Sequence, residues 1–305
     1  MNLRQIIKKN VQNQLKVRWN IGFVEFQKDS ILQQDKFEIH WMKHTYKDRW
    51  FADPFILNIT STDIVLLAEE FYYPIKRGRI ARLIVDKDSF ELKKTVTVLE
   101  LESHFSFPAI FTNGDEIYIY PENSASGKLI LYKYNIKEAT AVPVSTLSDE
   151  PLTDATITTL FDRPFIFSTK LPTPNGNELS IYTSDKWFGM YKLYHTVQFK
   201  DNTARNAGAI FQIGNKFIRP AQIYNGAYGK GLVMQEVLFQ DNKFFFNELK
   251  RFYPSSNEWN LGMHTFNVYR NLAVVDAKQY RNKNIAKILI SLKEKMKSWR
   301  INIFI

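Results

Sequence analysis

The amino-acid sequence predicts an all-β protein, a five-bladed β-propeller followed by a short C-terminal amphipathic helix. One unit recurs along the chain about every 50 residues, which suits four-stranded propeller blades and is too long a period for a β-sandwich. Apolar runs of about 4–7 β-branched and aromatic residues are bounded by Gly, Asn and Asp, as strands joined by hairpin turns are. Apolar residues at helical spacing are missing until the C-terminal tail.

The five units share one plan: a short first strand, a turn, a strongly apolar second strand ending in a polar residue, and a third strand. The first strands are expected at 53–56, 107–110, 154–157, 207–210 and 264–268. The second strands are expected at 64–67, 117–120, 164–167, 216–219 and 272–276. Strands as uniformly apolar as these are typical of blades stacked face to face. The segment 19–24 is expected to complete the last blade and close the ring.

The composition suits one large β-sheet domain. Of 305 residues, 45% are hydrophobic, which is enough for a sizeable core. The chain is rich in aromatic residues, with 24 Phe, 15 Tyr and 6 Trp. These side chains pack well on pleated sheets, and they also fit carbohydrate recognition.

The absence of cysteine excludes disulfides and thiolate metal sites. The N-terminal basic segment 1–18 has no continuous apolar stretch, so we interpret it as neither a signal peptide nor a membrane span. We therefore expect a cytoplasmic protein in which residues 19–282 form the propeller.

The net charge is +10, and much of the excess lies in the tail 283–305. Its basic residues are Lys283, Lys287, Lys293, Lys295, Lys297 and Arg300. Its apolar residues recur at helical spacing: Ile285, Ile288, Leu289, Leu292, Met296 and Trp299. A basic amphipathic helix of this kind either lies on an anionic membrane surface or packs on the propeller with a solvated basic face. Nucleic-acid binding is not expected.

Aligning the units brings scattered polar residues into register. In a propeller the first strand of each blade lines the central channel, so polar residues at its start converge. These positions carry Asp53, Pro108, Asp154, Asn206 and His264. The ends of the second strands carry Glu69, Glu122, Thr169, Ala221 or Gln222, and Asp276. Because an unpartnered buried carboxylate is costly, a cluster of them implies water, partners or a ligand, although each also has a plain reading as a turn or loop residue.

A second group of polar residues gathers in the fourth unit: Arg205, Asn206, Arg219, Gln222 and Tyr228. Arginine offers a planar fork for a carboxylate or phosphate, and the amides and the phenol suit sugar hydroxyls. We expect these five residues, with Trp50 and His264, to contact substrate. An arginine–aspartate network bridging two blades is the alternative.

Several motifs together resemble the N-terminal domain family of glucosamine inositolphosphorylceramide transferase and its stand-alone bacterial relatives. They are Trp-Phe-Ala-Asp-Pro-Phe at 50–55, Phe-Pro-Ala-Ile at 107–110, Tyr-Pro-Glu at 120–122, Ala-Arg-Asn-Ala-Gly at 204–208, Arg-Pro-Ala-Gln at 219–222 and Tyr-Gly at 228–229. The similarity spans residues 46–250. That domain is in turn similar to the five-bladed propellers of glycoside hydrolase family 43.

The resemblance implies roles for the aligned acids. Asp53 matches the carboxylate that acts as general base or nucleophile, and Asp154 matches the aspartate that adjusts the pKa of the general acid. The general acid has no clean counterpart, so Glu122 and Glu69 are candidates by location only. The sequence predicts no metal site and indicates no particular cofactor, although His264 could serve a channel ion.

We therefore expect a carbohydrate-active propeller that transfers or cleaves a glycosyl unit with paired carboxylates, in assembly of a cell-surface glycan or glycolipid. Its substrate would be a sugar, a nucleotide sugar or a glycolipid. The alternative is a non-catalytic glycan- or lipid-head-group-binding propeller that partners a separate glycosyltransferase, and a protein-binding scaffold is a third possibility. Ion pairs of Asp53 and Asp154 with Arg205 or Arg219, without an open cleft, would favour the non-catalytic alternatives.

Overall fold

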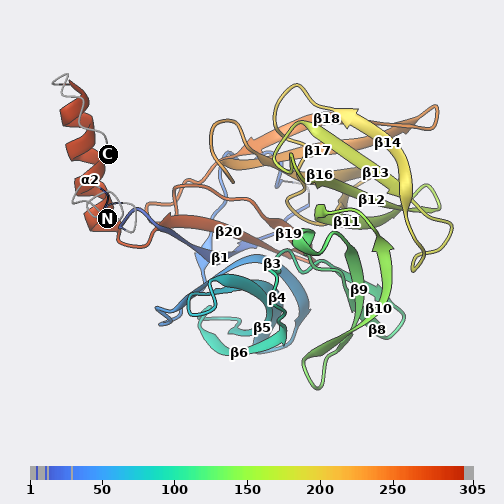
Figure 1. Cartoon of the computed structure of the whole chain (residues 1–305), viewed down its shortest axis with the longest axis horizontal. Coiled ribbons are helices and arrows are strands. Elements are labelled where there is room, and N and C mark those ends of the chain that lie inside the picture. The colour runs from blue at the N-terminus through green and yellow to red at the C-terminus, as the bar shows by residue number, and fades with distance from the viewer. Residues whose placement is uncertain (1–4, 6–10, 12–13, 29, 299–305) are drawn as a thin grey trace.

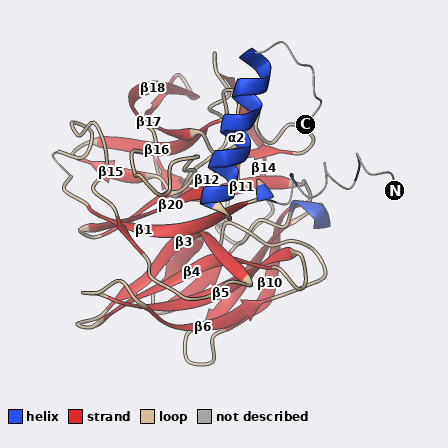
Figure 2. Cartoon of the chain, turned by 90° about the vertical axis from the view of Figure 1, so that its left-hand side faces the viewer, coloured by secondary structure: helices blue, strands red, loops and turns tan. Residues whose placement is uncertain are grey.

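The computed structural model confirms the predicted five-bladed propeller. It describes residues 5, 11, 14–28 and 30–298. Within these residues, five four-stranded antiparallel sheets are arranged as blades around a common centre (Figure 1). Strands make up most of the described chain, and helix α2 (Lys283–Ser298) rises from the β20 side (Figure 2).

The strand bounds follow the predicted repeat. Blade 1 contains β3 (Arg49–Ile59), β4 (Asp63–Tyr72), β5 (Arg77–Asp86) and β6 (Leu92–Leu99). Blade 2 contains β7 (Ile110–Asn113), β8 (Glu116–Ile119), β9 (Leu129–Asn135) and β10 (Thr140–Ser148), with a 3-10 turn at Ser124–Ser126. Blade 3 contains β11 (Leu152–Leu160), β12 (Arg163–Lys170), β13 (Glu178–Thr183) and β14 (Lys192–Gln198). Blade 4 contains β15 (Phe211–Ile213), β16 (Lys216–Ile223), β17 (Gly231–Gln240) and β18 (Lys243–Phe252).

Blade 5 joins the two ends of the propeller. It contains β19 (Phe266–Tyr269), β20 (Leu272–Tyr280), β1 (Val17–Glu25) and β2 (His40–Trp41), in that order. The β1–β20 ladder runs from Val17 opposite Tyr280 to Glu25 opposite Leu272. The expectation that 19–24 closes the ring is therefore confirmed. Clusters of buried apolar side chains pack between neighbouring blades.

Three first strands begin later than expected. Strand β7 begins at Ile110, β15 at Phe211 and β19 at Phe266, where the sequence suggested 107, 207 and 264. Ahead of β7 and β15 the chain makes single bridges, Ser106 with Glu122 of the loop after β8 and Asn206 with Ala221 of β16. Pro108 has no N–H to donate, so one ladder hydrogen bond is missing at this position.

Three residues near the channel adopt the left-handed backbone conformation: Asp53 (φ 50°), Phe107 (φ 45°) and Asp154 (φ 45°). A non-glycine residue in this region costs roughly 1–2 kcal/mol. At Asp53 and Asp154 the pairing with the second strand is interrupted, and the backbone N–H turns toward the neighbouring blade. The equivalent residue in blade 2 is thus Phe107, and not Pro108 as the alignment of the units suggested.

Helix α2 extends away from the blades (Figure 1). Ala286 is fully buried at its base, whereas Ile285, Ile288 and Leu292 are 45%, 61% and 50% exposed. Trp299 and Arg300, which the sequence placed in this helix, and most of segment 1–18 lie outside the described residues. In the part of the chain that the structure describes, no helix has the length and apolar character needed to cross a membrane.

Candidate functional site

Four buried acids gather where the blades meet the channel. Asp53 on β3, Glu69 on β4, Asp154 on β11 and Asp276 on β20 are 4%, 4%, 2% and 0% exposed. All four lie on first or second strands, as the alignment of the units predicted, but inside them, because these strands extend further than the sequence suggested. Burial of so many carboxylates requires hydrogen-bond donors or positive charge close by.

These carboxylates link neighbouring blades. Asp276 of blade 5 accepts a hydrogen bond from the backbone N–H of Asp53 in blade 1, at 2.9 Å. Asp53 accepts one from the N–H of Phe107 in blade 2, at 3.1 Å, and Glu122 of blade 2 accepts one from the N–H of Asp154 in blade 3, at 2.9 Å. Each donor is one of the three left-handed residues. The acids that form the cluster therefore also connect neighbouring blades through these hydrogen bonds.

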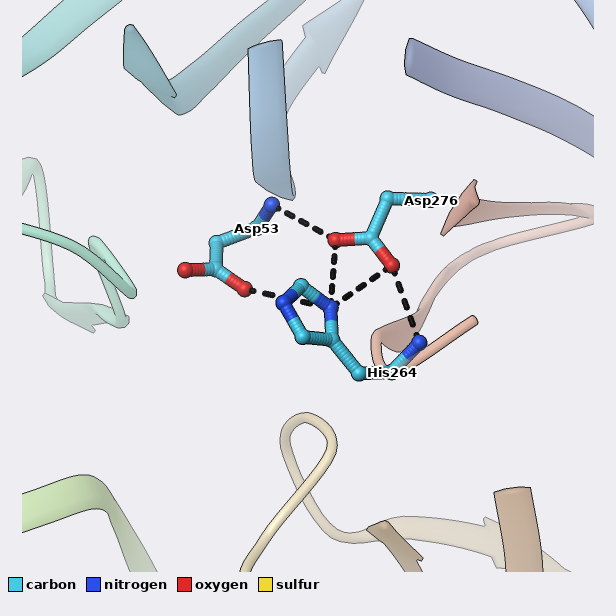
Figure 3. Close-up of side chains that lie close together, drawn as sticks. All are labelled: Asp53, His264 and Asp276. Atoms are coloured by element: carbon cyan, nitrogen blue, oxygen red, sulfur yellow. Dashed lines mark hydrogen bonds and ion pairs between the residues drawn. The ribbon is translucent and has the colours of Figure 1, made fainter. Parts of the chain in front are cut away.

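Asp53, His264 and Asp276 form the centre of the cluster (Figure 3). The His264 Nδ1 atom lies 2.8 Å from Asp276 and 3.8 Å from Oδ1 of Asp53. The Asp53 Oδ1 atom also accepts a hydrogen bond from the Thr265 hydroxyl, at 2.8 Å. The Trp19 ring stacks on the imidazole of His264 with centroids 4.0 Å apart, which fixes the ring plane.

The charges of this trio depend on one another. Burial raises the pKa of Asp53 to about 7; the His264 charge opposes this rise, and the carboxylates of Asp154, Asp276 and Glu69 add to it. Burial alone would lower the pKa of His264, but the charges of Asp276 and Asp53 outweigh it and raise that pKa. Burial alone would raise the pKa of Asp276, but the His264 charge outweighs it. Asp276 and His264 thus form an ion pair beside an Asp53 carboxyl that changes charge near neutrality.

The same trio offers ligand atoms of the types that bind metal ions, all within 4.8 Å of one another. Asp276 already accepts hydrogen bonds from the backbone N–H groups of His264 and Thr265 as well as from that of Asp53. An ion would replace the contact between His264 Nδ1 and Asp276. The hydrogen bonds account for the arrangement without an ion.

Arg205 bridges Asp154 and a fifth acid, Glu122, which lies in the loop after β8. Its guanidinium donates to both oxygens of Asp154, at 2.6 and 3.2 Å, and to Oε2 of Glu122, at 3.3 Å. A further donor reaches the side-chain oxygen of Asn175, at 2.9 Å. The side chains of Arg205 and Glu122 are each 12% exposed, against 3% for Asp154, so this end of the cluster is nearer to solvent.

Arg205 separates the two acids in acidity. Burial raises the pKa of Glu122 well above its usual value, and the neighbouring Asp154 charge raises it further, against the opposing effect of Arg205. Burial alone would raise the pKa of Asp154, but the Arg205 charge and hydrogen bonds outweigh it, so that pKa is lowered. Within this pair Asp154 is therefore the stronger acid and Glu122 the weaker one.

Three residues expected to contact substrate lie behind the acids. Arg219 and Asn206 have no exposed surface, and Gln222 is 2% exposed. Arg219 donates to Oδ1 of Asn206 at 2.7 Å, and Asn206 donates to the Asp154 carbonyl at 2.7 Å. Gln222 donates to Oδ2 of Asp154 at 2.6 Å. Their places fit residues that position Asp154, and not residues that touch a ligand directly.

Arg219 is unusual because its buried charge has no carboxylate partner among the described residues. Besides Asn206, its guanidinium donates to Gln235 and to the Ala204 carbonyl. The rings of Phe199 and Phe246 lie 5.7 and 5.5 Å from it. Burial lowers the pKa of Arg219 to about 9.

Glu69 and Trp50 lie on blade 1, at the edge of the cluster. Glu69 Oε1 is 3.2 Å from Nε2 of His104, whose side chain is 46% exposed. Trp50 is half-buried and stacks on Phe71 with centroids 4.8 Å apart. Trp50 thus offers an aromatic face near the acids, whereas Glu69 is engaged with a histidine that the sequence analysis did not single out.

Tyr228 lies close to two cations and to His264 of the cluster. The Arg205 guanidinium is 5.6 Å from its ring and the Lys278 ammonium 5.5 Å, while His264 meets the ring edge-on at 5.3 Å. Lys278 also donates to the Tyr228 carbonyl. Sequence reasoning missed Lys278 and Trp19, because nothing in a single strand indicates which distant loop it will face. It noted Asp276 only as the end of a second strand, the position that also carries Glu69 and Glu122.

Comparisons with known proteins agree with this description. The family model described as glucosamine inositolphosphorylceramide transferase 1, N-terminal, matches residues 39–289. A curated rice protein (Oryza sativa subsp. japonica), glucosamine inositolphosphorylceramide transferase 1, is 26% identical over 206 residues, which are 63% of this chain and 27% of the relative. The subsp. indica protein of the same name matches equally. The chain thus spans about a quarter of the length of these relatives.

Solved structures show the same fold at low identity. A GH43 β-1,3-galactosidase with galactodeoxynojirimycin has a TM-score of 0.50 and 9% identity, over 73% of this chain and 83% of that one. A GH43 protein from Bacillus licheniformis has a TM-score of 0.52 and 13% identity, over 70% of this chain and 48% of that one. At such identity the likeness is one of architecture.

Proposed function

This chain belongs to the family of glucosamine inositolphosphorylceramide transferase 1 N-terminal domains, and from that premise we propose that it is a carbohydrate-active protein that transfers or cleaves a glycosyl unit at the Asp53–Glu122–Asp154 cluster. The names of its relatives and the GH43 propellers that share its fold support a sugar-bearing substrate. The roles proposed for the individual residues rest on the contacts of this chain's own side chains.

The observation that carries the proposal is the contact of one arginine with two acids beside a third. Arg205 lowers the pKa of Asp154, whereas burial and the neighbouring Asp154 charge raise the pKa of Glu122. Asp53, in a separate environment, changes charge near neutrality. Carboxyl groups whose acidities are set apart in this way are what general acid–base chemistry on glycosides requires.

In the proposed reaction Glu122 gives its proton to the glycosidic oxygen as the bond from that oxygen to the anomeric carbon breaks. Asp53 takes a proton from a water molecule, for cleavage, or from an acceptor hydroxyl, for transfer. The oxygen thus freed of its proton forms the new bond to the anomeric carbon. One proton is given and one is taken, so the two carboxyl groups exchange protonation states in each turnover.

The rim of the cluster supplies the contacts for a sugar. Trp50, which stacks on Phe71, and Tyr228, which meets His264 edge-on, are half-buried aromatic residues. Lys278 lies 5.5 Å from the Tyr228 ring without a carboxylate within ion-pair distance among the described residues, so an anionic substituent on the sugar, such as a phosphate, would meet its positive charge there.

A panel of nucleotide sugars and aryl glycosides, assayed with the wild type and with Asp53→Asn, tests the proposal. We expect turnover to fall at least about 100-fold in the variant, the size of a typical general-base contribution. Asp162→Asn is the matched control, since Asp162 is an exposed aspartate that also has a left-handed backbone (φ 62°). Turnover that survives Asp53→Asn unchanged would remove Asp53 from the reaction.

A second candidate is a non-catalytic propeller that binds a glycan or lipid head group for a separate glycosyltransferase. The ion pair of Asp154 with Arg205 supports it, because an acid engaged in this way is also what a purely structural network contains. Asp53 has neither Arg205 nor Arg219 as an ion-pair partner among the described residues. Calorimetric sugar binding that persists in both Asp53→Asn and Glu122→Gln, without turnover in any variant, would favour this candidate.

We also propose that the reaction takes place in the cytoplasm and serves assembly of a cell-surface glycan or glycolipid. The cysteine-free sequence fits a reducing compartment. Cell fractionation, together with surface-glycan analysis of cells that lack the protein, checks this placement. An unaltered surface glycan would speak against it.

A further inference from the structure

A cleft of about 510 Å³ lies at the base of α2, away from the acid cluster. Its wall carries three cationic side chains, Arg18, Arg281 and Lys283, and a single acidic one, Glu258. Trp259 and Ile285 supply apolar surface. The cleft is therefore an amphipathic pocket with an excess of positive charge.

None of the three cations has a carboxylate within ion-pair distance among the described residues. The Arg18 guanidinium lies over the Trp259 ring at 5.3 Å. Arg281 lies over the Tyr73 ring at 4.5 Å and donates to the Lys47 carbonyl at 3.4 Å. Lys283 donates to the Asn257 carbonyl at 3.0 Å. Their charges are thus left for an anion to balance, and a phosphate group has the oxygens to accept from all three.

The wall of the cleft continues into an exposed apolar row on α2. Ile285 lines the cleft, and Ile288 and Leu292 follow at helical spacing on the same face. These three side chains are 45%, 61% and 50% exposed. The described α2 side chains include four lysines and one glutamate, so the helix combines an apolar face with net positive charge.

We propose that the cleft and this face of α2 form a docking site for an anionic lipid bilayer. A head-group phosphate occupies the cleft between Arg18, Arg281 and Lys283. Ile285, Ile288 and Leu292 enter the boundary between head groups and acyl chains, as the apolar face of an interfacial helix does. The lysines of α2 remain at the level of the anionic head groups.

The site is connected to the acid cluster through β20. Asp276 of the cluster, Lys278 of its rim and Arg281 of the cleft follow one another along this strand and its end. At about 3.3 Å per residue, Asp276 and Arg281 are roughly 16 Å apart. Docking would hold the cluster close to a membrane and so to a lipid-linked sugar. That consequence rests on the proposed function; the docking itself does not.

Co-sedimentation of the full chain with vesicles tests the docking without any turnover assay. We use phosphatidylcholine vesicles with and without about one quarter phosphatidylglycerol. The wild type is expected to bind only the anionic vesicles, and to lose binding as salt screens the charges. The double variant Arg18→Gln with Arg281→Gln is expected to bind at least about tenfold more weakly, since each basic residue near an anionic surface contributes roughly fivefold.

Two further variants distinguish loss of the docking site from loss of the fold or from a lower net charge. Ile288→Ser keeps every charge and is expected to weaken binding roughly tenfold through lost apolar insertion. The double variant Lys192→Gln with Lys243→Gln removes two exposed lysines elsewhere and is expected to bind like the wild type. Equal melting temperatures establish that all variants are folded.

Binding by the Arg18/Arg281 variant within twofold of the wild type, or unaffected binding by Ile288→Ser, would overturn the proposal. So would equal binding to neutral and anionic vesicles. A site for free phosphate would instead show thermal stabilisation by millimolar inorganic phosphate, lost in the Arg18/Arg281 variant, with no vesicle binding. That outcome also overturns the lipid docking.

Discussion

The backbone N–H of Asp53 donates a hydrogen bond of 2.9 Å to Oδ2 of Asp276, across the joint at which the last blade meets the first. The two residues are thus bound to each other both as parts of the ring and as parts of the acid cluster. Asp53 repeats the arrangement toward Phe107 of the second blade. Variants of these acids are therefore expected to change stability as well as activity, and matched controls must separate the two effects.

Asp276→Asn is expected to destabilise the fold by about 3–5 kcal/mol, because the substitution leaves the buried His264 without the charge that balances it. Chemical denaturation monitored by tryptophan fluorescence measures the change. Asp88→Asn, at an exposed turn, is the control and should stay within about 0.5 kcal/mol of the wild type. Equal stability of the two variants would show that Asp276 does not anchor the joint.

The stability of the wild type is expected to fall as the pH rises from about 4 to about 7. The pKa of Asp53 is about 7 in the folded chain, above its ordinary value of 3.8, so within this window the folded carboxyl keeps a proton that the unfolded one has released. The contribution is up to about 1.4 kcal/mol for each pH unit. Asp53→Asn should reduce this slope, and Asp162→Asn should keep it. Urea midpoints of the variants across this pH range measure the slope of stability against pH. A slope that is the same in Asp53→Asn as in the wild type would show that Asp53 titrates normally.

Glu69 and Glu122, the two candidates for the general acid, are distinguished by their contacts. Glu122→Gln is expected to lower kcat at least about 100-fold, whereas Glu69→Gln should leave kcat within about tenfold of the wild type. Glu69 contacts His104 and adds only a like charge to Asp53, while Glu122 lies between Asp154 and Arg205. Steady-state kinetics on the substrate found in the panel decides between them. The reverse ranking would transfer the role to Glu69.

Gly208→Ala is expected to destabilise the joint between blades 4 and 5 by about 3 kcal/mol. A Cβ atom at this position would lie 2.1 Å from the Phe266 carbonyl oxygen, which is backbone and cannot move aside easily. Thermal denaturation measures the loss. Gly214→Asn is the control, because Gly214 has a left-handed backbone in open space that asparagine tolerates. Equal melting temperatures for the two variants would show that blades 4 and 5 can move apart to make room for the added methyl group beside the Phe266 carbonyl oxygen.

The repeat allowed most of the fold to be predicted. Five units of similar length define the blades, and the spare strand at 19–24 could only complete the last of them. The same alignment brought Asp53 and Asp154 together with Glu69 and Glu122. In blade 2 the residue equivalent to Asp53 and Asp154 is Phe107, one position before the Pro108 that the alignment suggested, because dihedral angles are not visible in a sequence.

The depth of each side chain was harder to predict. Arg219 was expected to meet substrate because its planar fork suits an anion, yet it is fully buried behind Asn206, which is rare for an arginine. The stacking of Trp19 on His264 joins residues from opposite ends of the chain, and only the closure of the ring brings them together. Such contacts follow from tertiary packing and leave no local pattern.

The pH dependence of kcat/KM, compared between the wild type and Glu69→Gln, tests the central claim most directly. Asp53 must be ionised to act as the base, so the rate is expected to fall below an apparent pKa near 7, the pKa of that carboxyl. Removal of the Glu69 charge, which helps to raise that pKa, should shift this acidic limb to lower pH. An acidic limb at the ordinary pKa of an aspartate, or one that does not move in Glu69→Gln, would contradict the assignment of Asp53 as the catalytic base.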